Sequence, residues 1–136
     1  MRLLPAILWL ALGGAAGTLV RVGLSTLTQK LHGGPWPAGT LAANALGCLL
    51  FGLVFALLEP GHRLAPAARL GLLAGFCGAL TTFSTYAFDT AQLARGQAFP
   101  AAGLAHALLN LLLHNAVGFT LLVAGLALGA RLRPAA

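Results

Sequence analysis

Hydroxyl side chains, two glycines and three aromatic rings are concentrated in residues 75–86 of this 136-residue chain, in the order GFCGALTTFSTY. The surrounding sequence is apolar enough to lie in a lipid bilayer. Lipid gives backbone amides and carbonyls no water, so an interrupted helix at membrane depth survives only where it is buried in protein or lines an aqueous path. The free backbone groups of such a break are those from which ion sites are made. The segment therefore predicts an ion site within a membrane protein.

The composition excludes an ordinary soluble domain. Hydrophobic residues make up 59% of the chain and charged residues 7%, whereas charged residues approach about a quarter of a soluble domain. A spanning helix needs about 20 mostly apolar residues, and the sequence places four spans near residues 3–28, 37–58, 66–93 and 99–130. We expect one all-α transmembrane domain over residues 1–136, with antiparallel neighbouring spans and a third span that is broken in its middle.

The net charge of +6 does not indicate a nucleic-acid partner. The basic residues are scattered near helix ends and do not gather on one face, and anionic lipid headgroups account for arginines at such places. The side that holds both termini and the middle loop carries Arg2, Arg63, Arg69, Arg131 and Arg133, and the other side carries Lys30 and Arg95. This modest excess, five basic residues against two, predicts that both termini lie in the cytoplasm.

Three sequence motifs carry a resemblance to a known family. The order Gly-x-x-Thr-Thr-Phe-Ser-Thr at residues 78–85 resembles the signature of the small bacterial fluoride channels of the Fluc/CrcB family, as does Gly-Thr-Leu-x-x-Asn-x-x-Gly at residues 39–47. Asn-Ala-Val-Gly at residues 115–118 resembles the family's last helix. The resemblance implies an antiparallel, dual-topology homodimer that passively exports F⁻ and relieves fluoride toxicity. The charge excess departs from the weak bias that insertion in both orientations asks for.

Candidate groups for an anion pathway lie in the first three spans. Fluoride is small and tightly hydrated, so its path must replace water with well-placed donors; Ser84 and Thr85 supply hydroxyls, and Thr82 is a further candidate. Asn44, in the middle of the second span, either holds the anion through its N–H groups or bonds a neighbouring helix; the family context favours the anion. Arg21 either attracts anions to a vestibule or extends toward lipid headgroups.

Phe83 and Tyr86 form an aromatic pair three residues apart, on one face of a helix. An aromatic ring is positive at its edge, so two rings presented edge-on can contact a partly dehydrated anion while their bulk narrows the path against chloride. In the family both positions are phenylalanine, whereas the second is Tyr86 here. Without the motif, the same spacing would more often indicate packing.

The resemblance also implies a structural Na⁺ at the centre of the dimer, held by the backbone carbonyls of Gly78 and Thr81. These residues bracket the expected break. Two subunits would supply four carbonyl oxygens, and oxygen is the ligand that a hard cation prefers.

Asp89 extends the polar stripe of Ser84 and Thr85 and matches a position that is usually glutamate in the family. A carboxylate on an anion path must be protonated, paired or near the mouth. Asp89 is therefore either a pathway residue or a charge near a helix end.

The fourth span contributes Asn110, His114 and Asn115. The resemblance assigns Asn115 to the pathway. Asn110 and His114 are four residues apart and share a helical face, which we expect to pack against the third span. A lone histidine there is more typical of a hydrogen-bonded core group than of a metal ligand.

Small residues recur at four-residue spacing in each span, including the pairs Gly13/Gly17, Gly71/Gly75 and Gly125/Gly129. Such spacing lets helix backbones approach closely. Each pair either packs helices within one subunit or joins two subunits, and helices this rich in glycine hardly enclose a pore alone. We therefore expect an oligomer.

Two other function classes remain as alternatives. A proton-coupled small-cation or drug exporter needs a titratable carboxylate in its core, and Asp89 is the one available within a span. A non-transporting assembly protein would use its glycine faces only for association. The sequence contains no His/Cys cluster, nucleotide-binding glycine loop or nucleophile–base pairing, so an enzyme is not expected, and Cys48 and Cys77 are read as small apolar packing residues.

Overall fold

The computed structural model describes residues 3–58, 64–96 and 101–133, and regular structure within them is helical. The elements are α1 (Leu3–His32), α2 (Ala38–Leu57), α3 (Pro66–Leu70), the π-helical η1 (Gly71–Cys77), α4 (Gly78–Leu80), α5 (Phe83–Ala94) and α6 (Gly103–Leu132). They form four segments long and apolar enough to cross a membrane, the third being Pro66–Ala94. The prediction of an all-α fold with four spans is confirmed.

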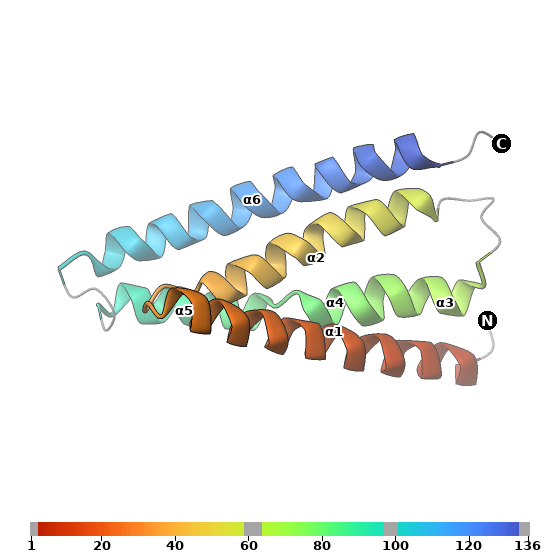
Figure 1. Cartoon of the computed structure of the whole chain (residues 1–136), viewed down its shortest axis with the longest axis horizontal. Coiled ribbons are helices and arrows are strands. Elements are labelled where there is room, and N and C mark those ends of the chain that lie inside the picture. The colour runs from red at the N-terminus through yellow and green to blue at the C-terminus, as the bar shows by residue number, and fades with distance from the viewer. Residues whose placement is uncertain (1–2, 59–63, 97–100, 134–136) are drawn as a thin grey trace.

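Consecutive segments run antiparallel, and both ends of the chain lie at the same end of the molecule (Figure 1). The described basic residues divide between the two ends as expected, with Arg69, Arg131 and Arg133 beside the termini and with Lys30 and Arg95 opposite. Arg2 and Arg63 lie outside the described residues. The charge asymmetry of the sequence is thus an asymmetry between the two ends of the helix bundle.

The first helix packs closely on the π-helical part of the third segment. A Cβ atom on Gly13 would collide with the carbonyl oxygen of Gly71, and one on Gly17 would collide with the carbonyl oxygen of Phe76. Glycine at these positions lets the two backbones touch, which strengthens van der Waals packing where lipid offers no hydrophobic driving force.

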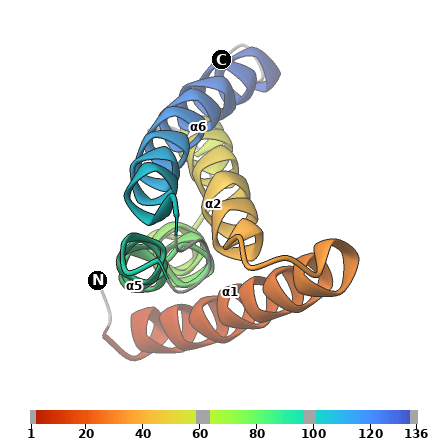
Figure 2. The same ribbon diagram turned by 90° about the vertical axis from the view of Figure 1, so that its left-hand side faces the viewer.

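The second and sixth helices lie against each other and away from most of α1 (Figure 2). A Cβ atom on Gly52 would meet the carbonyl oxygen of Leu122, and one on Gly125 would meet that of Leu49. Gly52 and Gly125, like Gly13 and Gly17 on α1, therefore serve packing within one chain. They lend no support of their own to an oligomer.

The third segment is broken at Thr81 and Thr82, where the backbone is extended with φ/ψ of −82°/154° and −149°/116°. The sequence placed the start of the break at Gly78, which is wrong: Gly78 is helical at −65°/−34° and begins α4. Thr82 then caps α5, because its hydroxyl oxygen accepts a hydrogen bond from the Thr85 amide at 3.2 Å. A threonine cap of this kind stabilises the new helix start.

The ends of the long helices differ from the expected span limits. Helix α1 continues beyond residue 28 and ends at His32. The next residue, Gly33, has φ +59° and donates its N–H to the Gln29 carbonyl at 2.9 Å. This is the left-handed glycine ending common at helix C-termini. Helix α6 begins at Gly103, and residue 99, the expected start of the fourth span, lies outside the described residues.

Large apolar side chains are exposed along the outer helices. Leu12 on α1, and Leu112 and Phe119 on α6, are each 68% exposed. Exposed apolar side chains of this kind are stable in contact with lipid. Their outward orientation therefore agrees with helices that cross a membrane.

Candidate functional site

A hollow of about 300 Å³ lies beside the break, where α2, α5 and α6 meet. It is lined by the candidate pathway residues Asn44, Thr82, Phe83, Tyr86 and Asn115, together with Cys48, Thr81, His114 and Gly118. Residues up to 74 positions apart in sequence (44 to 118) thus share one small volume. The motifs of the second, third and fourth spans converge there.

Asn44 holds the peptide of Thr82. Its Oδ1 accepts a hydrogen bond from the Thr82 N–H at 2.7 Å, and its Nδ2 donates to the Thr82 carbonyl at 3.2 Å. Because a backbone amide only donates, the orientation of the Asn44 carboxamide is fixed. Nδ2 carries two hydrogens, and the bond to Thr82 commits one of them. Asn44 therefore bonds a neighbouring segment and also retains a donor for a ligand.

Of the hydroxyl groups at the break, that of Thr82 is hydrogen-bonded within the start of α5, and that of Ser84 is exposed. The Thr82 hydroxyl donates to Thr85 Oγ1 at 3.0 Å while it accepts the Thr85 amide. Ser84 Oγ lies 3.3 Å from Thr82 Oγ1 and is on the exposed side of α5. Neither Ser84 nor Thr85 lines the hollow. The Thr82 hydroxyl proton is directed to the helix start, and Ser84 presents its hydroxyl outward.

Phe83 and Tyr86 are in edge-to-face contact, with ring centroids 5.8 Å apart and planes at 66°. The prediction that they share one helical face is confirmed. Their environments differ sharply, because Phe83 is 79% exposed and Tyr86 is 9% exposed. The Tyr86 hydroxyl oxygen accepts a hydrogen bond from Asn115 Nδ2 at 3.3 Å, so the group that distinguishes Tyr86 from phenylalanine has a partner on α6.

Two candidate pathway residues lie near the break but outside the hollow. Arg21 donates from Nε to the carbonyl of Ala79 at 3.1 Å, which brings its positive charge to the end of α4. Asp89 accepts a hydrogen bond from the Thr40 hydroxyl at 2.6 Å, between α5 and α2. The carboxylate is thus tied to a neighbouring helix and is not among the residues that line the hollow.

The polar residues of α6 pack against α5, as the sequence predicts. Asn110 is fully buried, and its Nδ2 donates to Thr90 Oγ1 at 2.8 Å. The His114 ring lies over the Tyr86 ring with centroids 4.4 Å apart. The sequence reasoning missed that His114 and Cys48 line the same hollow as Asn44. The four-residue spacing of Asn110 and His114 was the one signal for this face. It predicted which helix face packs against α5, but it did not predict that the face borders the hollow.

The break also exposes the two carbonyls proposed for Na⁺. In an unbroken helix the amides of Thr82 and Thr85 would bond the carbonyls of Gly78 and Thr81, four residues back. Here the Thr82 amide donates to Asn44 and the Thr85 amide donates to the Thr82 hydroxyl. The carbonyl oxygens of Gly78 and Thr81 therefore lack their helical amide partners, and the Thr81 hydroxyl donates a long hydrogen bond of 3.5 Å to the Gly78 carbonyl. Backbone carbonyls released at a helix break suit Na⁺, so the residues present fit the cation.

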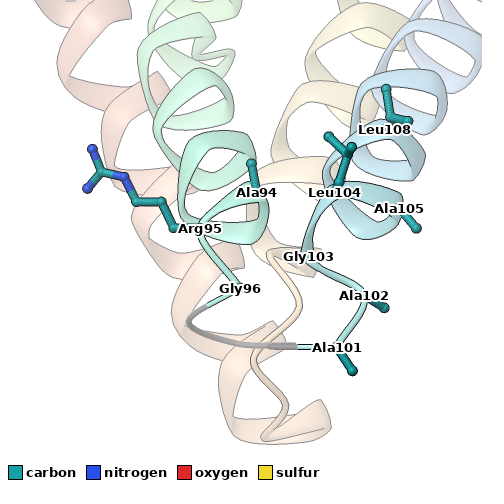
Figure 3. A pocket seen from close by; sticks show the side chains of 9 residues that line it. All are labelled: Ala94, Arg95, Gly96, Ala101, Ala102, Gly103, Leu104, Ala105 and Leu108. Carbon is teal, nitrogen blue, oxygen red and sulfur yellow. The ribbon is translucent and has the colours of Figure 1, made fainter.

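A larger hollow of about 560 Å³ lies at the turn between α5 and α6. Figure 3 shows that it is lined mainly by alanines, glycines and leucines, with the Arg95 side chain directed away from α6. Among its described lining residues, Arg95 is the one with a charged or polar side chain. Binding sites combine apolar walls with several convergent polar groups, and this hollow lacks that arrangement.

Comparison with known proteins gives extensive matches. The family model described as CrcB-like protein, Camphor Resistance (CrcB), matches residues 8–126. The Fluoride-specific ion channel FluC of Maridesulfovibrio salexigens is 43% identical over 122 residues, which cover 90% of this chain and 93% of the relative. A protein of the same name from Solidesulfovibrio magneticus is 45% identical over 121 residues, covering 89% and 93%. The chain therefore belongs to the CrcB-like family.

Proposed function

We propose that the chain forms a fluoride-selective channel, through which F⁻ leaves the cell passively across the inner membrane and fluoride toxicity is relieved. The observation that carries the proposal is the 43% identity, over nine-tenths of the chain, to a relative named a fluoride-specific ion channel. The convergence of three spans on a hollow beside a broken helix supports it. The names of the relatives do not favour the exporter or the assembly protein.

The proposed pathway assigns a task to each group of residues. The charge of Arg21 attracts the anion toward the break. The second Nδ2 hydrogen of Asn44 and the hydroxyls of Ser84 and Thr85 replace water of hydration. Phe83 and Tyr86 present ring edges, whose positive potential tolerates a partly dehydrated anion.

Three further residues complete the proposal. Thr82 contributes by holding the helix start in place, since its hydroxyl proton is directed to Thr85. Asn115 orients the Tyr86 ring through the hydroxyl. Asp89 is restrained by Thr40 and stands beside the path, where a free carboxylate would repel the anion.

We extend the proposal to a homodimer. Phe83 is 79% exposed and Ser84 is exposed, although both lie at the middle of a membrane-spanning segment. A hydroxyl and an irregular backbone at this depth are tolerated only where protein or an aqueous path covers them. A second copy of the chain would supply that cover and would close the open side of the hollow.

An antiparallel arrangement of the two copies is part of the proposal and follows the family resemblance. Its test is accessibility in intact cells, with single cysteines at Lys30 and at Arg131, which lie at opposite ends, in a background without Cys48 and Cys77. Because Lys30 is in the last turn of α1 and Arg131 is in the last turn of α6, dual insertion predicts that an impermeant maleimide labels a comparable part of each variant. Complete labelling at one end and none at the other would contradict it.

The proposed Na⁺ belongs at the dimer centre, where the carbonyls of Gly78 and Thr81 from two copies would supply four oxygens. The bound cation would lower the cost of an anion near the bilayer centre. Replacing Na⁺ by a bulky organic cation during purification is expected to weaken the dimer in detergent. An unchanged dimer, with no Na⁺ retained after dialysis, would contradict the assignment.

Growth in fluoride tests the function in cells. Expression in a bacterium that lacks its own fluoride exporter should restore growth, and the same strain should gain no resistance to toxic organic cations. Continued fluoride sensitivity at normal expression would contradict the proposal. Cation resistance that is lost on Asp89→Asn would favour the exporter.

A further inference from the structure

The His114 side chain lines the hollow beside the break and contains a buried polar atom that lacks a partner among the described residues. His114 is 8% exposed and lines the hollow beside the break. Its Nε2 is fully buried and has no hydrogen-bond partner within residues 3–58, 64–96 and 101–133. Buried polar atoms are nearly always hydrogen-bonded, so each exception calls for a partner such as water or an ion.

The other ring nitrogen determines what Nε2 can do. His114 Nδ1 lies 3.1 Å from the carbonyl oxygen of Asn110. A carbonyl only accepts, so Nδ1 carries the hydrogen in this bond. The neutral ring then leaves Nε2 as a bare acceptor, whereas the protonated ring makes it a charged N–H donor. The state of this one atom decides whether the group repels or holds an anion.

Titratable groups approach His114 from the two helices packed beside it. From α5, the Tyr86 ring centroid lies 4.4 Å from that of the imidazole, and Asp89 is the acidic residue of the same helix. From α2, Cys48 lines the same hollow. An anion in the hollow would stabilise the imidazolium over the neutral ring.

Resting on the proposed channel function, we propose that His114 is a fluoride ligand only when its ring is protonated, so that acid promotes fluoride passage. The proton comes from water and is bound at Nε2, which then donates a charge-assisted hydrogen bond to F⁻. Fluoride and the proton occupy the hollow together, with the second Nδ2 hydrogen of Asn44 as a further donor. In the neutral ring Nε2 carries a lone pair in place of a hydrogen, so it offers the anion no donor.

Efflux at different pH values gives the first test. Histidine changes charge between about pH 5 and 8, so fluoride release from liposomes is measured across this range, after subtraction of the HF leak from protein-free liposomes. Wild-type efflux should rise as pH falls, by about fivefold or more, the lower end of typical couplings between two ligands. His114→Gln supplies an N–H donor at every pH and should flatten the profile.

His106 provides a matched control on the same helix. Its Nδ1 lies 2.8 Å from the Ala102 carbonyl, and its ring contacts Trp36, away from the hollow. His106→Gln should keep the wild-type pH profile. A flat wild-type profile, or an unchanged pH dependence in His114→Gln, would overturn the inference while fluoride efflux itself would still support the channel. Absence of efflux at every pH would overturn both.

Linkage supplies a second test that needs no variant to fold. If protonation of His114 strengthens fluoride binding, fluoride must strengthen proton binding by the same factor. Nuclear magnetic resonance of the ¹⁵N-labelled histidines in the detergent-solubilised protein should show the His114 titration midpoint moving to higher pH with NaF and not with NaCl. A midpoint that fluoride leaves in place would overturn the inference.

Discussion

Asn44 pairs with the Thr82 peptide through both of its polar atoms, with contacts of 2.7 Å to the amide and 3.2 Å to the carbonyl. The Asn44 side chain thereby gives the Thr82 amide an acceptor in place of the helical carbonyl that the break removes. It also ties α2 to the start of α5, which positions Phe83 and Tyr86. One residue of the second span thus stabilises the irregular backbone of the third.

The first prediction concerns this pair. Asn44→Leu keeps the side-chain volume and removes both hydrogen bonds, so the Thr82 amide loses its acceptor. An unsatisfied buried group of this kind costs about 1–3 kcal/mol. We expect a lower thermal unfolding temperature in detergent and a large loss of fluoride efflux.

Thr28→Val is the control for Asn44→Leu. The Thr28 hydroxyl bonds the Leu24 carbonyl within α1, far from the break, so its removal should leave both measurements near wild type. Normal efflux in Asn44→Leu would contradict the role assigned to Asn44.

The second prediction concerns Phe83. The ring is 79% exposed in the single chain, so Phe83→Ile leaves little internal cavity and the dimer should remain assembled. The positive ring edge is lost, and efflux should fall to the level of protein-free liposomes. Phe88→Ile is the matched control, because Phe88 is 62% exposed on the same helix and does not line the hollow. Unchanged efflux in Phe83→Ile would remove the aromatic-edge role.

The third prediction concerns the hydroxyl of Tyr86. Tyr86→Phe removes the bond from Asn115 Nδ2 and restores the residue found in the resembled family. Since a neutral hydrogen bond contributes about 0.5–1.5 kcal/mol, the variant should stay folded. Its efflux should change by less than about tenfold, which corresponds to 1.4 kcal/mol. Fluoride efflux from liposomes is measured with chloride as the reference ion. Complete loss of fluoride efflux in Tyr86→Phe would contradict the prediction and show that the hydroxyl is essential.

The fourth prediction compares two neighbouring glycines of α1. A Cβ atom on Gly17 would collide with the Phe76 carbonyl, whereas one on Gly14 meets nothing within 4 Å. Gly17→Ala should destabilise the protein by about 1–3 kcal/mol, as overpacking does. Gly14→Ala should be neutral or stabilising by up to about 1 kcal/mol, because alanine is the better helix former. Equal unfolding temperatures for the two variants would contradict the packing of α1 on η1.

The four spans could be predicted from sequence because hydropathy is a local property that a bilayer enforces directly. The break was also foreseen, although its position was shifted. Gly78 looked like its start, but a glycine followed by apolar residues can remain helical. The extended residues are Thr81 and Thr82. The Thr82 amide donates to Asn44, and the Thr82 hydroxyl caps α5.

The contents of the hollow could not be predicted in the same way. Whether His114 faces Tyr86 depends on how α6 is rotated against α5, which side-chain packing over the whole bundle decides. The separation of Asp89 from the hollow likewise follows from its contact with Thr40 on another helix. Asn44 and Phe83, which the resemblance assigned to the anion pathway, both line the hollow beside the break, whereas the resemblance gave His114 no role.

Ion flux through the purified protein tests the central claim most directly. Liposomes containing the protein and loaded with equal fluoride and chloride are diluted into a medium free of both, and each anion is followed with its own electrode. The account predicts rapid release of F⁻ with Cl⁻ retained, and no release of either from liposomes with Phe83→Ile. Failure of folded, dimeric wild-type protein to release F⁻, or release of Cl⁻ at a similar rate, would contradict a fluoride-selective channel.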